Sequence, residues 1–134
     1  MRLVVSASAA IIKGNKILLA KRSKTEHKFP GCWTFAGGKL DDPADTLAET
    51  AVREVKEEIG LDLKDPKMFG FYESFSPDCH AIGHVFIGEA SGTLKLDPEE
   101  VEECRLFTYE ETLKLEMAFA YRDVLDDIHR HGLI

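Results

Sequence analysis

Long apolar runs are missing from the 134 residues, whereas a membrane-spanning helix needs about 18 or more consecutive apolar residues. Internal repeats, low-complexity tracts and linker-like segments are missing as well. A hydrophobic content of 44% excludes a disordered chain, which would be dominated by polar and charged residues. The length predicts a single domain over residues 1–134, and no membrane partner is expected.

Positive charge is in short supply. The chain has 24 acidic and 17 basic residues, a net charge of −7, and no basic cluster larger than Lys21–Arg22. Proteins that grip phosphate backbones normally present a basic face, so we expect no polymeric nucleic acid as partner. A small phosphorylated ligand remains compatible, because a bound metal ion can supply the missing positive charge.

The chain has only three cysteines, and they are far apart in the sequence. Cys32, Cys79 and Cys104 form no C-x-x-C pair, so we predict reduced thiols in a cytoplasmic protein. Cys79 lies close to His80 and His84, but this spacing matches no zinc-binding pattern. Ordinary loop and strand positions are the better interpretation of these three residues.

The apolar stretch 3–12 has two interpretations, a weak secretory signal or a buried strand. Gly14–Asn15 follows it as a turn and leads into a second apolar run at 16–21. Two strands joined by such a turn form a hairpin, which is the simpler account.

The remaining pattern predicts a mixed sheet packed between helices, an α/β fold. Gly60 is a suitable left-handed end for a helix over 46–59, and Thr108 with Glu111 forms a capping box that starts a short helix. Gly37–Gly38 is predicted as a turn and 39–45 as an acidic loop. The other expected elements are strands at 32–36, 67–75, 81–89 and 104–107 and a last helix at 116–131.

Three carboxylates of the helix at 46–59 share one strip of its surface. At about 100° per residue, Glu57 and Glu58 lie on either side of Glu54. Like charges at this spacing repel, and anions are unfavourable in the last helical turn. A bound divalent cation would make the same arrangement favourable, because such an ion takes several carboxylates as ligands. A solvated acidic face of the helix remains the alternative. The predicted apolar stripe is Ala48, Val52, Val55 and Ile59, and the predicted solvent-facing arc is Glu49, Arg53 and Lys56.

Asp41, Asp42 and Asp45 raise the possibility of an EF-hand. Their spacing does not follow its alternating ligand order, and no register places a glycine where the loop requires one. We therefore exclude this motif.

The segment Gly38–Leu61 resembles the Nudix box, G-x5-E-x7-R-E-U-x-E-E-x-G-U, where U is a bulky aliphatic residue. Its second half, Arg53–Leu61, matches at every specified position, and Trp33–Lys39 resembles the usual lead-in. The first half is one residue longer than the family pattern, and the simplest alignment replaces its glutamate by Asp45. An aspartate there could cap the helix.

The resemblance to MutT-like Nudix hydrolases implies an α/β/α sandwich and metal-dependent hydrolysis of a nucleoside diphosphate linked to another group. It implies that Glu54, Glu57, Glu58 and the Gly37 carbonyl bind Mg²⁺ or Mn²⁺, and that Arg53 orients a catalytic glutamate. Gly38 and Asp45 would brace the loop. Which carboxylate is the general base is left open, and a homodimer is common in the family.

Further candidates come from the rest of the sequence. Arg22 and Lys39, with Lys21, are candidate phosphate contacts close to the glycines, although each is more often a plain surface residue. Trp33, Phe71 and Tyr72 could stack on a base but are equally compatible with a core. A later acidic group is expected from one of Glu99, Glu100, Glu102 and Glu103.

Pro77 follows Leu61 at a spacing that resembles the marker of the ADP-ribose pyrophosphatase branch. On this basis we expect ADP-ribose or a similar nucleoside diphosphate sugar as substrate, with Pro77 shaping one wall of the pocket. Nucleoside triphosphates of the house-cleaning type are the alternative. A non-catalytic Nudix-like binding module is disfavoured, because all three box glutamates are present.

Overall fold

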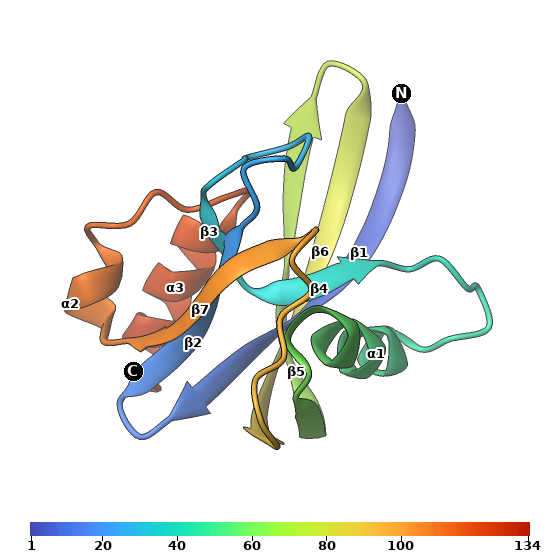
Figure 1. The fold of residues 1–134 in the computed structure, drawn as a ribbon. Coiled ribbons are helices and arrows are strands. Elements are labelled where there is room, and N and C mark those ends of the chain that lie inside the picture. The colour runs from blue at the N-terminus through green and yellow to red at the C-terminus, as the bar shows by residue number, and fades with distance from the viewer.

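The computed structural model describes residues 1–134 and contains one seven-stranded sheet with helices on both faces (Figure 1). The strand order is β3-β2-β1-β6-β5, with β4 paired to β1 and β7 paired to β2. β1 and β6 are parallel and all other pairs are antiparallel, so the predicted mixed sheet is confirmed. The elements are β1 (Arg2–Lys13), β2 (Lys16–Arg22), β3 (Trp33–Thr34), β4 (Ala36–Lys39), α1 (Leu47–Ile59), β5 (Asp62–Ser76), β6 (Cys79–Ser91), β7 (Val101–Phe107), α2 (Tyr109–Thr112) and α3 (Tyr121–Arg130).

Two hydrophobic clusters hold the helices to the sheet. Successive residues of a strand point to opposite faces, and accordingly Ala9 of β1 packs with the α1 cluster while Ala10 packs with the α3 cluster. α1 contributes Ala51, Val55 and Ile59 to the first cluster, and α3 contributes Val124, Leu125 and Ile128 to the second. This arrangement is the predicted α/β/α sandwich.

Helix α1 begins one residue later than predicted and has a different cap. The hydroxyl of Thr46 accepts from the backbone N–H of Glu49, and the Glu49 carboxylate accepts from the N–H of Thr46. The expectation that Asp45 caps the helix is therefore wrong, because Thr46 already forms a complete capping box. Val52, predicted on the buried stripe, is 37% exposed. The helix ends at Gly60, which has the predicted left-handed conformation.

Gly37 and Gly38 form part of β4 and not a turn. They pair antiparallel with Ser8 and Ala7 of β1. A Cβ atom at Gly37 would overlap the Ala7 carbonyl oxygen and the Ser8 side chain. The glycine is needed for close approach of two backbones, which a sequence pattern does not distinguish from a turn.

Three other boundaries differ from the prediction by more than two residues. β5 starts at Asp62, because a bulge accommodates Asp65 and Pro66 inside the strand. β7 starts at Val101, before the start of the strand predicted at 104–107. α3 starts at Tyr121, because the segment before it adds to β3 through a hydrogen bond from Ala118 N–H to the Trp33 carbonyl at 2.8 Å. None of the helices has the length and apolar character that a membrane crossing requires.

Candidate active site

A cavity of about 600 Å³ brings Glu54 and Glu58 of the box together with the β4 glycines. Its walls include β1, β4, β5, β6 and α1, the loop after β2 and the start of α3. Among its acidic residues are Glu54, Glu58 and Glu100, and among its basic ones Arg22 and Lys39. Segments far apart in the sequence therefore form a single pocket.

Glu58 is fixed by the backbone of β4. The Gly37 N–H donates a hydrogen bond of 2.9 Å to its Oε2 atom. Burial raises the pKa of Glu58 to about 9, the Gly37 bond opposes this rise, and the neighbouring charges of Glu54 and Glu100 add to it. The pocket thus holds carboxylates whose negative charge is poorly compensated by protein groups.

Glu54 is only 13% exposed and lies against Gly38. A Cβ atom at position 38 would lie 2.5 Å from the carboxyl carbon of Glu54. Burial raises the pKa of Glu54, and the charge of Glu57 raises it further, whereas Arg53 lowers it. Gly38, to which the resemblance assigns a bracing role, therefore makes room for the Glu54 carboxylate.

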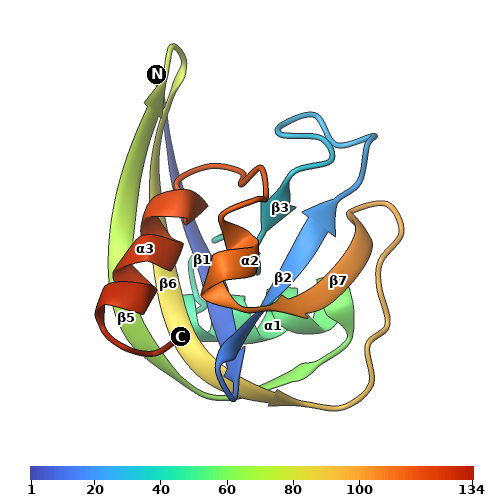
Figure 2. The same cartoon turned by 90° about the vertical axis from the view of Figure 1, so that its left-hand side faces the viewer.

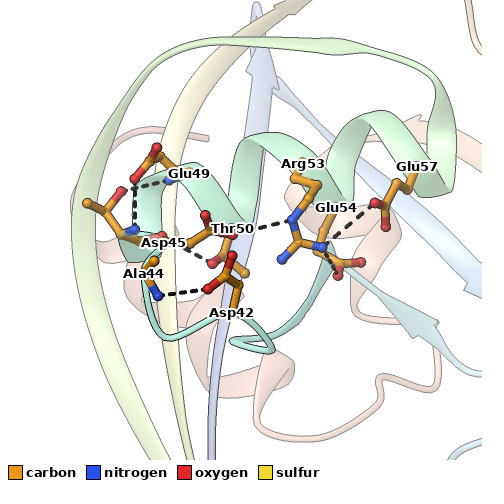
Figure 3. A network of polar contacts seen from close by, with 9 residues as sticks. Asp42, Ala44, Asp45, Glu49, Thr50, Arg53, Glu54 and Glu57 are labelled. Carbon is orange, nitrogen blue, oxygen red and sulfur yellow. Dashed lines mark hydrogen bonds and ion pairs between the residues drawn. The ribbon is translucent and has the colours of Figure 1, made fainter.

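Arg53 joins the loop before α1 to the carboxylates (Figure 3). Its guanidinium contacts Asp45 at 3.6 Å, Glu54 at 3.2 Å and Glu57 at 3.7 Å. The Nη2 atom is buried without a hydrogen-bond partner. Arg53, predicted on the solvent-facing arc, keeps 35% of its side-chain surface exposed, and these acidic neighbours hold its guanidinium along the helix. Asp45 contacts the arginine and does not cap the helix.

Glu57 stands apart from the other two box glutamates. Its side chain is 58% exposed, contacts Arg53 and does not line the cavity.

No group of three or more His, Cys, Asp or Glu side chains lies close enough together to hold a metal ion. His80 instead contacts Glu73, and His84 contacts the Ser6 carbonyl.

The donor set nevertheless fits a hard divalent cation. Such ions take carboxylate and carbonyl oxygens as ligands, and Glu54 and Glu58 offer buried carboxylates beside the backbone of Gly37 and Gly38. Burial is the main cause that raises the pKa of both groups, and a bound cation would favour their charged forms.

Of the candidate bases, Arg22 and Lys39 line the cavity, whereas Lys21 forms an ion pair with Glu102 at 3.4 Å. The Arg22 Nε–H donates to the Lys28 carbonyl at 2.9 Å, and Nη2 donates to Glu26 at 3.3 Å. Sequence reasoning missed three further basic residues of the lining, namely Arg2, His27 and Lys28. Every second side chain of a strand lies on the same face. Ser8, Ser6 and Val4 line the cavity, so this alternation would have suggested Arg2 as the next lining residue.

Among the candidate later acids, Glu100 lines the cavity. Burial raises its pKa, with Glu26 and Asp97 adding to the rise. Glu102 and Glu103 instead pair with Lys21 and Arg105. Glu99 does not line the cavity.

Of the three candidate aromatic residues, only Tyr72 lines the cavity. Trp33 is buried in the core cluster beside Phe107. Tyr72 lines the cavity and donates a hydrogen bond of 2.8 Å to Asp127, whereas the preceding Phe71 is 65% exposed and does not line it.

Pro77 lies in the turn between β5 and β6 and is not part of the cavity lining. The prediction that it shapes a pocket wall is wrong, because the lining includes Ser74 and Cys79 on the two strands but not the proline in the turn between them. Phe119 and Tyr121, which line the cavity, were not predicted.

Comparison with known proteins agrees with this geometry. A model of the NUDIX domain matches residues 2–128. The chain is 34% identical over 128 residues to a protein named ADP-ribose pyrophosphatase from Methanocaldococcus jannaschii, covering 94% of this chain and 73% of the relative. The structure of a MutT protein from Methanosarcina mazei Go1 has a TM-score of 0.84 and 28% identity, covering 97% of this chain and 95% of that chain.

Two other relatives carry different names. A protein named 8-oxo-dGTP diphosphatase from Proteus vulgaris is 33% identical over 86 residues, covering 64% of this chain and 75% of the relative. A protein named NAD-capped RNA hydrolase NudC from Mannheimia succiniciproducens is 31% identical over 108 residues, covering 79% of this chain but 40% of that relative. The chain therefore matches less than half of the NudC length.

Nudix hydrolases generally use divalent metal ions, in agreement with the oxygen donors of the cavity. The domain match spans nearly the whole chain, and the relatives reported above are named as a pyrophosphatase, a diphosphatase and a hydrolase. The chain belongs to the Nudix family and is a pyrophosphohydrolase.

Proposed function

We propose that this enzyme hydrolyses the diphosphate of ADP-ribose or a similar nucleoside diphosphate sugar, giving AMP and ribose 5-phosphate from ADP-ribose. The arrangement of Glu54, Glu58 and Glu100 in one cavity with Arg22 is the observation that carries the hydrolytic part of the proposal. The choice of substrate is supported by the 34% identity to a protein named ADP-ribose pyrophosphatase over 94% of this chain.

Glu54, Glu57, Glu58 and the Gly37 carbonyl would hold Mg²⁺ or Mn²⁺, with Glu100 as a further acidic ligand. When bound, such an ion neutralises the charge that builds up on the phosphate oxygens and makes water a better nucleophile. Glu57 must turn inward for this role, which its exposed position permits.

The chain's own residues position the substrate and the water. Arg22 and Lys39 bind phosphate oxygens, and Arg53 orients Glu54 through its contact at 3.2 Å. One of the cavity carboxylates accepts a proton from water while the water oxygen bonds to phosphorus. The bridging P–O bond breaks, and its electron pair leaves with the departing phosphate.

Nucleoside triphosphates are the second candidate substrates. The identity of 33% to a protein named 8-oxo-dGTP diphosphatase favours them, although it extends over only 64% of this chain. Cleavage would then give a nucleoside monophosphate and pyrophosphate. Pro77 supports neither candidate, because it does not line the cavity.

A substrate screen with Mg²⁺ and with Mn²⁺ tests the proposal. ADP-ribose, other nucleoside diphosphate sugars and nucleoside triphosphates are incubated with the enzyme, and the products are separated and identified. Reaction in ¹⁸O-labelled water shows which phosphorus is attacked, since the label enters only that product. Absence of AMP and ribose 5-phosphate from the ADP-ribose reaction would contradict the proposal.

A further inference from the structure

Two phenylalanines from distant parts of the chain pack together beside the cavity. Phe29 lies in the loop between β2 and β3, and Phe119 lies in the segment that leads into α3. Figure 2 shows both segments in the upper part of that view. Their ring centroids are 4.7 Å apart, and Phe119 lines the cavity.

Both residues have backbone conformations that bulky side chains rarely adopt. The φ angles are 49° at Phe29 and 50° at Phe119, in the left-handed region. Such strain persists only where surrounding contacts impose it. Phe119 also packs edge-on against Tyr121, with centroids 6.1 Å apart. The orientation of the Phe119 ring is thus fixed from two sides.

The Phe119 ring faces the guanidinium of Arg22, with 5.2 Å between the guanidinium carbon and the ring centroid. The loop after β2 fixes the same guanidinium by its edge, through the Lys28 carbonyl and the Glu26 carboxylate. Edge and face of the group are both restrained, so Arg22 has little freedom to turn away from the cavity.

We propose that Phe119, braced by Phe29, is a positioning residue that holds the Arg22 guanidinium in place for a substrate phosphate. This inference rests on the proposed function to the extent that Arg22 binds phosphate. A cation–π contact restricts the cation to the face of the ring. Arg22 is therefore oriented before substrate arrives, and less freedom is lost on binding.

The test compares Phe119→Leu, which removes the aromatic face, with Phe119→Tyr, which keeps it. For Phe119→Leu we expect KM to rise roughly threefold to thirtyfold, the range of a cation–π contact, with kcat within about twofold of the parent. Phe119→Tyr restores the parent KM. Phe119→Gly removes the ring without the left-handed strain, so it still folds if other variants do not. Phe71→Leu, an exposed position outside the cavity, is the matched control and leaves both constants unchanged.

A double-mutant cycle with Arg22→Ala shows whether Phe119 acts through the arginine. We expect KM of the double variant to equal that of Arg22→Ala alone, because the ring then has no cation to hold. Additive effects would overturn the inference, since they would mean that Phe119 contacts the substrate itself. An unchanged KM in Phe119→Leu would overturn it as well.

The same cycle is run on the dissociation constant of ADP, measured by calorimetry. If the parent binds ADP but hydrolyses no nucleoside diphosphate sugar, the proposed function fails while non-additive ADP affinities still support the role of Phe119. If the parent binds no ADP, Arg22 holds no phosphate and the inference is overturned.

Discussion

Glu58 is buried, and the acidic side chains of Glu54 and Glu100 are among its charged neighbours. Its pKa is raised from 4.5 to about 9, chiefly by burial. A carboxyl group with a raised pKa in the folded state stabilises the fold at low pH, and this contribution is lost as the pH rises through the folded pKa.

We therefore expect the free energy of unfolding of the metal-free protein to fall between pH 4.5 and about 9. Glu58→Gln, which has no ionisable group but still accepts from the Gly37 N–H, should flatten this dependence. Denaturant unfolding of both proteins in the presence of a chelator measures the difference. Equal pH dependence in parent and variant would show that Glu58 is not its source.

Measurements of kcat distinguish the proposed metal-binding role of the box glutamates from their effect on stability. Glu57→Gln and Glu58→Gln should each lower kcat by orders of magnitude, because each removes a charge that would hold the cation. Their stability without metal should be unchanged or higher, since repulsion between carboxylates falls. Steady-state kinetics and thermal unfolding provide the comparison. Near-full activity of Glu57→Gln would mean that this exposed residue does not turn into the site.

Gly38→Ala tests the space reserved for Glu54. The added methyl group would lie 2.5 Å from the Glu54 carboxyl carbon, so the flexible end of this side chain must shift. We expect activity to fall more than about tenfold, because a catalytic group displaced by about 1 Å loses its geometry, while the fold persists. Activity and circular dichroism are measured on the same preparation. Full activity of Gly38→Ala would show that catalysis does not need the space beside Glu54.

At the level of elements, two neighbouring residues at the start of α1 are expected to have different roles: Thr46 caps the helix, and Asp45 holds Arg53. Thr46→Ala removes the cap and should cost about 1 kcal/mol of stability with little loss of activity per folded molecule. Asp45→Ala removes an Arg53 partner and should cost less stability, since such exposed pairs contribute about 0.2–1 kcal/mol. Its activity should fall more, because Arg53 is less firmly held. The reverse pattern in unfolding and activity assays would make Asp45 an ordinary structural residue.

The sequence predicted most elements because local signals mark them. Thr108 with Glu111 gives the capping box of α2, and Gly60 gives the end of α1. Long-range pairing decided the exceptions. Gly37 joins β4 because Ser8 lies beside it, and Ala118 leaves the helical pattern because it bonds to Trp33. No local propensity contains this information.

For the molecule as a whole, the sandwich explains which part of the site was predictable. The carboxylates of α1 follow one another at helical spacing, so their pattern is visible in the sequence. The opposite walls come from separate segments, and Lys28 and Phe119 reach the cavity only through the folding of the loop after β2 and of the segment before α3. Glu100 could be placed within a short acidic stretch but not chosen from it.

The most direct test of the central claim is a comparison of kcat/KM for ADP-ribose and for nucleoside triphosphates, with the metal ion that supports the higher rate. This ratio reports the difference in transition-state stabilisation between competing substrates. We predict that ADP-ribose is preferred and gives AMP and ribose 5-phosphate. A preference of more than about tenfold for a triphosphate, equal to about 1.4 kcal/mol in barrier height, with release of pyrophosphate, would contradict the assignment.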